Sequence, residues 1–558
     1  MPTVSDVTFE PVDGAEELFT PSFCEYFAHM HDVFGARVAA FRVGREQASH
    51  RAVRQHQPPS SPPPSDATTQ DWQVPAVPAE LRKPGIEITG PVSITNMFIN
   101  ALNPGPDGTR AEGDLDDDED SAGHRLIDTV QAALNRLHAV EGGLTYHDEA
   151  RGRDYAVQDG PLPFFMHRER GLHLDEPDAT LKGAPVSAAI LGTALTLFHA
   201  GRAQAAAGQG IYFYLPKMES SAEAAFWRDF FAESQARLPH LRDATIRAIP
   251  LVESLPAVYE MEEILHALGP YAAGLNAARW DLKASILEYV MADPDLVWPD
   301  RFGVDIKTTD FMSNIFRRLV AVCLKHGAVA IGGMATALPS RDEEVNVAAA
   351  AAIRADKEWE AEQGFTRGWV AHIFHMDVAA APFKRLVDSG WTPSAAMMEP
   401  DNYPIEIKRP EGKITLEGTR RNLRTLIEYV EGWLNGRGAK GIDSLAGKPG
   451  LHPALMEDLA TARISVAQTA QRIIHSAKDE VSGEVHDVPL VKRVLLSEEE
   501  DIVKHLGVNA SAEAIDYYRR ATKVTMQWIK NYTEFDFRSL GSYTRGELED
   551  ISVAPDAL

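Results

Sequence analysis

The stretch Ala248–Asp281, AIPLVESLPAVYEMEEILHALGPYAAGLNAARWD, contains two short apolar runs, and a carboxylate follows each of them. Glu253 comes directly after AIPLV, and Asp281 is the third residue after AAGLNAA. Between the runs, apolar residues recur on one helical stripe, formed by Val258, Met261, Ile264, Leu265 and Leu268. The pattern predicts a strand–helix–strand unit with parallel strands. Since neighbouring parallel strands lie about 4.8 Å apart, both carboxylates are expected at one sheet edge, close enough to share a cation.

The same alternation of strand-like runs and helix-period stretches extends over residues 85–374. The predicted strands are GIEITG (from residue 85), TRAEGDL (109), PLPFFMH (161), GIYFYLP (210), ATIRAIPLV (244), AAGLNAA (272), AVAIGGM (328) and RGWVAHIF (367). Eight strands separated by helices predict an α/β fold, a closed (β/α)₈ TIM barrel whose chemistry lies at the carboxyl ends of the strands. An open doubly wound sheet is the alternative for the same pattern.

The regions on either side of this alternation have a different character. Residues 21–55 have helical periodicity, and the proline-rich run QPPSSPPPSDATTQ, from residue 57, predicts a linker. After residue 392 the alternation stops, and residues 418–438, 458–480 and 512–535 predict three amphipathic helices. We therefore predict an N-terminal helical segment with linker over residues 1–80, a barrel domain over 81–392 and a helical C-terminal domain over 393–558.

Composition excludes several classes of function. With 81 acidic and 55 basic residues the net charge is −26, which argues against a nucleic-acid or anionic-membrane surface but not against a small anionic substrate in a local cationic pocket. Two cysteines, Cys24 and Cys323, cannot build a disulfide framework. The N-terminus lacks a signal-peptide pattern and no apolar run reaches about 18 residues, so a cytoplasmic protein is expected.

The two carboxylates of the opening stretch are candidate metal ligands. Oxygen ligands without sulfur favour Mg²⁺ over zinc, so Glu253 and Asp281 predict a magnesium site. The alternative is a pair of surface carboxylates that follow strands. Further charged residues at predicted strand ends are Glu119 and Asp120, Arg168 and Arg170, and Lys217 and Glu219. One barrel mouth would then hold carboxylates for a cation and an arginine for an anionic substrate.

Glu119 and Asp120 end the acidic run DLDDDED, residues 114–120. So many adjacent carboxylates cannot all be buried in ionised form, because each buried charge needs a partner. A solvated acidic loop is therefore the expectation for most of this run.

A series of motifs along the chain resembles one enzyme family. The motifs are IEITGPVSITNMFINALNPG, DDEDS, RERGLHL, GIYFYLPKMES, VESLPAVYEMEEI, GLNAARWD, IGGMATALP, ADKEWEA, GWVAH and MEDLATARIS, in this order. From about Asp71 to about His475 the chain resembles malate synthase, in its A-type branch. The resemblance implies a TIM barrel with an N-terminal helical clasp and a C-terminal helical plug over its mouth.

The resemblance also implies a reaction. The family condenses acetyl-CoA with glyoxylate and hydrolyses the thioester to malate and CoA, using Mg²⁺, in the glyoxylate cycle. It implies Glu253 and Asp281 as metal ligands, Arg168 on glyoxylate and the developing oxyanion, Asp458 as general base, and Glu119 and Asp120 as an outer shell. A positioned carboxylate suits the weakly acidic methyl group of acetyl-CoA. From its local sequence alone, Asp458 is predicted to cap a helix.

The chain departs from the family pattern near the expected site. Ala278 and Leu282 stand where the family commonly has glycine and tyrosine around Arg-Trp-Asp, and Ile373 stands where it usually has proline. These departures leave open a related synthase with a larger 2-oxo acid or another acyl-CoA. The pattern is also compatible with a malyl-CoA or citramalyl-CoA lyase and with a non-catalytic scaffold.

Overall fold

The computed structural model describes residues 7–443, 445, 452–507 and 510–554. It contains two compact units. The first, which we call the barrel unit, comprises Met1–Arg45, Ser61–Ala278 and Arg317–Tyr403. The second, the helical unit, comprises Glu46–Ser60, Arg279–Phe316 and Pro404–Leu558. The domain boundaries at residues 80 and 392 remain predictions.

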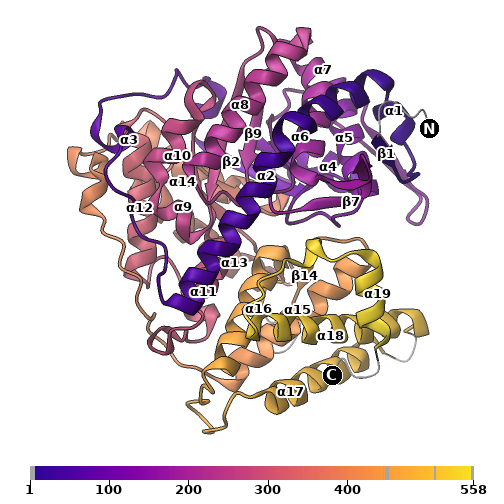
Figure 1. Cartoon of the computed structure of the whole chain (residues 1–558), viewed down its shortest axis with the longest axis vertical. Coiled ribbons are helices and arrows are strands. Elements are labelled where there is room, and N and C mark those ends of the chain that lie inside the picture. Colours follow the sequence, from indigo (N-terminus) through magenta and orange to yellow (C-terminus); the bar gives the residue numbers. More distant parts are fainter. Residues whose placement is uncertain (1–6, 444, 446–451, 508–509, 555–558) are drawn as a thin grey trace. The chain divides into compact units, whose positions relative to one another are not determined.

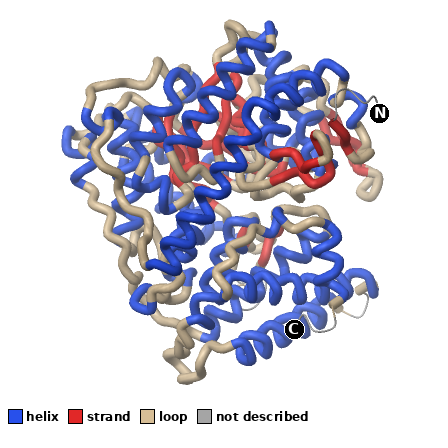
Figure 2. Tube along the Cα trace, viewed as in Figure 1, coloured by secondary structure: helices blue, strands red, loops and turns tan. Residues whose placement is uncertain are grey.

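Eight parallel strands of the barrel unit form a closed barrel in the order β10-β11-β12-β13-β2-β3-β6-β9. They are β2 (Gly85–Pro91), β3 (Gly113–Asp117), β6 (Phe164–Arg168), β9 (Ile211–Leu215), β10 (Ile246–Val252), β11 (Gly274–Ala277), β12 (Val329–Ala335) and β13 (Arg367–Val370). Figure 2 shows them in red among the blue helices of this unit. Each strand overlaps a predicted run, although β2, β3, β6 and β12 end one or two residues beyond it. The barrel is therefore confirmed and the open sheet is excluded.

The strand register determines where the carboxyl ends meet. β10 pairs with β9 from Ile246↔Ile211 to Pro250↔Leu215, and its last residues pair with β11 as Leu251↔Asn276 and Val252↔Ala277. β10 and β11 therefore end at the same level. The residues that follow them, including Glu253, start from one rim of the barrel.

Helices connect most successive strands of the barrel. They are α4 (Thr95–Leu102), α5 (Leu126–Val140), α6 (Ala188–Phe198), α7 (Ala200–Ala206), α8 (Ser221–Arg237), α9 (Leu255–Tyr259), α10 (Met261–Leu268), α12 (Asp310–Lys325), α13 (Glu343–Gln363) and α14 (Met376–Asp388). One helix was predicted over residues 254–268, but Glu260 is not helical there and separates α9 from α10. Its carboxylate instead accepts hydrogen bonds from the backbone N–H and hydroxyl of Ser221.

The N-terminal segment forms α2 (Pro21–Gln55), as predicted. Its part within the barrel unit packs on α8. The Tyr26 hydroxyl lies 2.8 Å from that of Ser234, and Arg37 donates to Asp229 over 2.8 Å. These contacts hold α2 along the outside of the barrel.

Several smaller elements were not predicted. A three-stranded antiparallel sheet, β1-β7-β8, and a hairpin of β4 and β5 lie in the barrel unit. Their bounds are β1 (Val7–Phe9), β4 (Thr145–Asp148), β5 (Arg153–Ala156), β7 (Asp175–Leu181) and β8 (Ala184–Ser187), with the short helices α1 (Ala15–Leu18) and α3 (Asp66–Thr69). β8 takes the first residues of a segment predicted as helix over 184–206.

The helical unit contains more helices than predicted. Besides α11 (Arg279–Tyr289), it has α15 (Leu416–Leu434), α16 (Leu459–Ile474), α17 (Val488–Leu506), α18 (Ala512–Thr533) and α19 (Arg545–Val553), with the strands β14 (Lys440–Ile442) and β15 (Leu455–Glu457). α15, α16 and α18 match the three predicted helices, and α17 and α19 were not predicted. The orange and yellow ribbons of Figure 1 trace these C-terminal elements.

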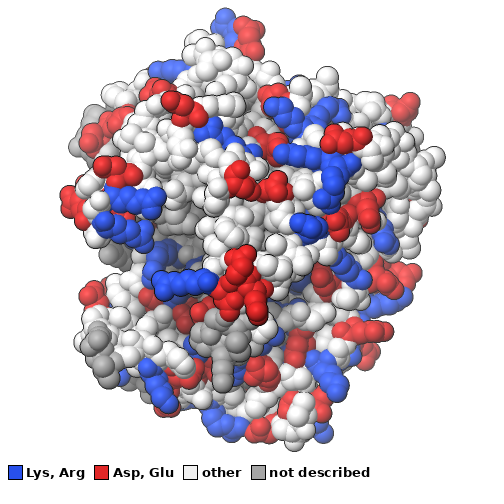
Figure 3. Space-filling view, turned by 180° about the vertical axis from the view of Figure 1, so that it is seen from behind, with Lys and Arg blue, Asp and Glu red and all other residues white. Residues whose placement is uncertain are grey.

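Charged side chains of both signs are present on the surface (Figure 3). On the face drawn in Figure 3, acidic and basic groups are interspersed. Among the described helices, none combines the length and the apolar character that crossing a membrane requires.

Candidate metal centre and active site

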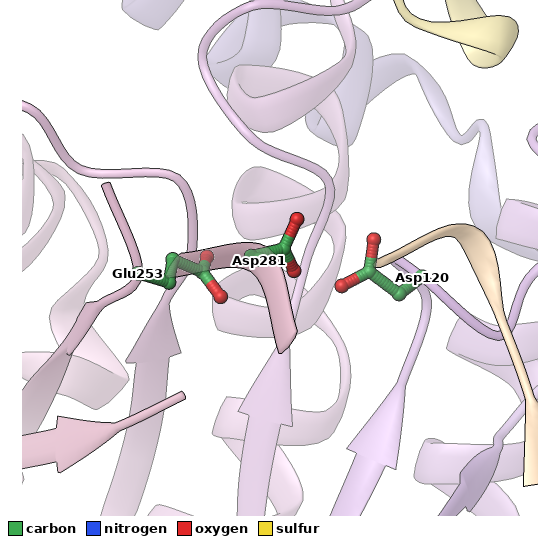
Figure 4. A group of neighbouring side chains, drawn as sticks. All are labelled: Asp120, Glu253 and Asp281. Carbon is green, nitrogen blue, oxygen red and sulfur yellow. The ribbon is translucent and has the colours of Figure 1, made fainter. Parts of the chain in front are cut away.

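Three buried carboxylates gather at the barrel rim. Asp120, Glu253 and Asp281 each offer one oxygen, and these atoms lie within 4.8 Å of one another. Figure 4 shows the three side chains beyond the carboxyl ends of the strands, toward which the arrowheads point. Glu253 directly follows β10, Asp120 follows β3 by three residues, and Asp281 is the third residue of α11. The two predicted ligands therefore lie together, and Asp120 lies within the same 4.8 Å of both.

Arg168, the last residue of β6, is fixed beside this group. Its Nε and Nη2 each donate to Asp117 over 2.7 Å, in a bidentate pair. Its Nη1 lies 3.9 Å from Glu119 and 3.8 Å from Asp120. Burial lowers the pKa of Arg168, but Asp117 more than offsets this and the pKa stays well above its usual value. Arg168 is therefore a permanently charged donor with a set orientation.

Lys217, two residues after β9, is the second cation of the rim. Its Nζ lies 2.7 Å from Asp120, 3.2 Å from Glu119 and 3.8 Å from Glu253. Its φ of 53° is left-handed, which is strained for a residue with a side chain. The backbone N–H donates to Glu253 over 2.5 Å and the carbonyl accepts from Arg45 over 2.6 Å, so this conformation orients a metal-ligand candidate.

We call these groups of the barrel unit the rim cluster: Asp117, Glu119, Asp120, Arg168, Lys217 and Glu253. Among these six residues, four carboxylates lie close to two cations, and all of them are buried. A divalent cation would be attracted to such a concentration of carboxylates. In an octahedral Mg²⁺ site adjacent ligand oxygens lie roughly 3 Å apart, so oxygens that are up to 4.8 Å apart would need to approach one another by up to about 2 Å. All three donors are oxygens, which fits Mg²⁺ better than zinc.

The acidic run is buried, contrary to the expectation of a solvated loop. All six of its carboxyl groups are at most 2% exposed. The cations that make this possible come from distant parts of the chain. Asp116 accepts from Arg136 over 2.5 Å and lies 2.7 Å from His167 Nδ1, while Glu119 and Asp120 face Lys217. The expectation was wrong because these partners are adjacent only in the folded chain.

Two carboxyls of the run are accommodated through a raised pKa. Burial raises the pKa of Asp118 to about 8, although Arg170 opposes the rise. Asp114 has no hydrogen-bond partner for either oxygen among the described residues, and burial raises its pKa well above the usual value. A protonated carboxyl carries no charge, so its burial costs far less free energy.

Asp458, predicted as the general base, belongs to the helical unit. It is the N-cap of α16, where its Oδ1 accepts from the Thr461 N–H over 3.2 Å, and it is 4% exposed. The capping role expected from the local sequence is therefore confirmed. A cap engages one carboxylate oxygen, so it is compatible with proton transfer at the other.

Asp281 has a partner within the helical unit as well. Arg463 of α16 donates from Nη1 to Asp281 Oδ1 over 2.6 Å. Sequence reasoning gave no role to Asp117, Lys217 or Arg463. Lys217 had a signal, its place at a strand end, whereas Asp117 and Arg463 are recognised only by the side chains they contact.

Comparisons with known proteins point in one direction. The family model for the malate synthase TIM barrel domain matches residues 164–404, and that for the malate synthase C-terminal domain matches residues 413–545. Malate synthase A of Escherichia coli is 37% identical over 477 residues, which cover 85% of each chain. Malate synthase of Myxococcus xanthus is 35% identical over 83% of this chain and 82% of its own.

A plant relative is also similar. Malate synthase, glyoxysomal, of Ricinus communis is 34% identical over 85% of this chain and 82% of its own. These matches favour neither a lyase nor a non-catalytic scaffold. A chain that matches both family models, and shares more than a third of its residues with a malate synthase over 85% of both lengths, belongs to the malate synthase family and is therefore an acyltransferase.

Proposed function

We propose that this enzyme condenses acetyl-CoA with glyoxylate and hydrolyses the resulting thioester, releasing malate and free CoA, and that it requires Mg²⁺. The observation that carries the proposal is the group of three buried carboxylate oxygens within 4.8 Å, beside Arg168, in a member of this family. Glu253 and Asp281 would hold the cation. The spacing of the oxygens supports Asp120 as a third ligand, and Glu119 would stand in the outer shell.

The bound cation would supply Lewis acidity at the glyoxylate carbonyl and a fixed point for its carboxylate. Arg168 would bind the substrate through Nη1, because Asp117 already engages Nε and Nη2. Its charge faces the oxygen on which negative charge grows as the new carbon–carbon bond forms. Arg168 cannot accept a proton at neutral pH, so we assign it electrostatic stabilisation rather than base catalysis.

Asp458 would take one methyl proton from acetyl-CoA. A carboxylate held by a cap keeps its orientation, and positioning matters because the donor carbon is a weak acid. The carbanion so formed attacks the carbonyl carbon of glyoxylate. Water then cleaves the malyl thioester and releases the thiol of CoA.

The experiment that tests this function is thiol release by purified protein with Mg²⁺, across a panel of acyl-CoAs and 2-oxo acids. We expect acetyl-CoA with glyoxylate to give the highest kcat/KM, together with malate. A higher value for a larger 2-oxo acid would assign the chain to a related synthase. Cleavage of malyl-CoA to acetyl-CoA without thiol release would assign it to the lyases. A cytoplasmic location remains a prediction, since some relatives are glyoxysomal by name.

The base assignment has its own variant. Asp458→Asn should lower kcat by roughly 10²–10⁴-fold, because asparagine cannot accept the proton. Asparagine caps helices as well as aspartate, so the melting temperature should stay within a few degrees. Asp487→Asn, at the N-cap of α17, is the matched control and should keep full activity. Equal kcat in wild type and Asp458→Asn would remove Asp458 from the mechanism.

A further inference from the structure

Arg463 joins two carboxylates on one face of α11. Its Nη1 donates to Asp281 over 2.6 Å, and its Nη2 lies 3.0 and 2.8 Å from the two oxygens of Glu288. Asp281 and Glu288 are seven residues apart, about two helical turns, so their side chains lie on the same face. The Tyr532 hydroxyl, from α18, donates to Glu288 over 2.8 Å. Three helices of the helical unit thus converge on this network.

The network is largely removed from water. The side chains of Asp281, Glu288 and Arg463 are 3%, 10% and 15% exposed. A guanidinium group cannot be deprotonated in a protein at neutral pH. Arg463 is therefore charged at every working pH. Poor access to water makes its charge-assisted hydrogen bonds stronger than those of an exposed pair.

We infer that Arg463 is a positioning residue for the metal ligand Asp281, an inference that rests on the proposed function. A carboxylate has two oxygens, so one can accept from Arg463 while the residue contributes the other to a cation. Arg463 lies on α16, whose N-cap is Asp458, so one helix carries both the proposed base and the group that orients a proposed ligand. Supporting contacts of this kind set the orientation of metal ligands.

A cation next to a metal ligand could also repel the metal. Here Glu288 binds Arg463 through both of its oxygens, so the Arg463–Glu288 pair contributes little net charge at Asp281. Orientation then outweighs repulsion. This predicts a specific effect of Glu288→Gln. The variant leaves more of the positive charge of Arg463 acting on Asp281, so it should weaken metal binding although Glu288 is not a proposed metal ligand.

The test measures Mn²⁺ binding to the substrate-free, full-length protein. Electron paramagnetic resonance detects the unbound ion and so gives the dissociation constant. The variants are Arg463→Met, Arg463→Lys, Glu288→Gln and Tyr532→Phe. Arg420→Met is the matched control, because Arg420 is also a partly exposed arginine of the helical unit that bridges two carboxylates, Glu417 and Glu498. The Mg²⁺ concentration that gives half-maximal activity is measured in parallel.

We expect Arg463→Met to weaken Mn²⁺ binding about 10–100-fold and to raise the half-saturating Mg²⁺ concentration by a similar factor. Arg463→Lys should recover part of the loss, because one ammonium cannot bind two carboxylates as a planar guanidinium does. The loss of Mn²⁺ affinity in Glu288→Gln should lie between the losses in Arg463→Met and Arg463→Lys. Tyr532→Phe should change the affinity least. Arg420→Met should bind Mn²⁺ like wild type, even if it melts at a lower temperature.

The outcomes separate this inference from the proposed function. If wild type binds Mn²⁺ and both Arg463→Met and Glu288→Gln bind it with the same affinity, the positioning role is overturned. The proposed function then remains intact. Absence of Mn²⁺ binding in wild type would overturn both. If Arg463→Met fails to fold, Arg463→Lys and Glu288→Gln decide the question, since wild-type affinity in both contradicts the inference.

Discussion

Two of the buried charge clusters in the barrel unit differ in their composition. Inside the barrel, Glu87 accepts from Arg367 over 2.8 Å, from the Tyr214 hydroxyl over 2.6 Å and from Trp369 over 3.1 Å. Arg367 also donates to the carbonyl of Leu81 over 2.6 Å. One carboxylate and one guanidinium thus pair with each other, and neutral hydroxyl, indole and carbonyl groups complete their hydrogen bonds. The rim cluster instead has four carboxylates for two cations.

This difference separates a structural cluster from a functional one. The charges around Glu87 are matched by the chain itself, so they need nothing from outside. In the rim cluster several carboxylate oxygens instead lie close together at the carboxyl end of the barrel, and a group of buried oxygens of this kind suits the binding of a divalent cation. Burial alone would not distinguish the two, because Glu87 and Glu253 are 0% and 2% exposed.

Removing the acid of the balanced cluster should have the largest effect on stability. Glu87→Gln leaves Arg367 buried without its counter-charge, and we expect unfolding in urea to show a loss of about 3–5 kcal/mol. The response of the melting temperature to Mg²⁺ should remain. If the free energy of unfolding falls by less than about 1 kcal/mol, the Glu87–Arg367 pair is not a structural cluster of this kind.

Removing an acid of the rim cluster should not destabilise the metal-free protein, in contrast to Glu87→Gln. In metal-free buffer Glu253→Gln should be as stable as wild type or more so, because it relieves like-charge repulsion and its amide oxygen can still accept from Lys217. At Mg²⁺ near 100 times the dissociation constant, wild type should gain about 2.7 kcal/mol, and Glu253→Gln should lose most of this gain.

Glu262→Gln is the matched control for this variant. Glu262 is also buried, but Lys325 and His326 pair with it at 2.7 and 2.9 Å. It should lose stability and keep the Mg²⁺ response. A full Mg²⁺ response in Glu253→Gln would remove Glu253 from the metal site.

Asp114 tests a third way to bury a carboxyl, and its effect per pH unit should be the smallest of the three. Its pKa is raised well above the usual 3.8, so above about pH 4 the unfolded chain releases a proton that the folded chain retains. Stability should therefore fall as pH rises toward the folded pKa, by at most about 1.4 kcal/mol per pH unit from this group. Asp114→Asn should flatten that slope.

Urea unfolding of wild type and Asp114→Asn at pH 5, 6 and 7 measures the difference. The two curves should diverge with increasing pH, with the variant the more stable at pH 7. Parallel curves would show that Asp114 is ionised in the fold.

The barrel strands could be predicted because a buried parallel strand needs a continuous apolar run, and such runs are local. The same rule located Glu253 and Asp281, since residues after parallel strands share one rim. The break between α9 and α10 could not be predicted, because it depends on the contact of Glu260 with Ser221. The burial of the acidic run was missed for the same reason, as its partners Arg136 and Lys217 are distant in sequence.

The sequence by itself determined the eight strands, the long N-terminal helix, the motifs of the malate synthase family and the strand-end positions of the acidic residues. The spacing of apolar residues and the position of a residue after a strand are local properties of the sequence. They can therefore be recognised without information about the rest of the chain. Only the tertiary structure decided which charges are compensated. The free energy of a buried charge depends on the groups within a few ångströms of it, and folding brings those groups from β3, β6, α5 and α16.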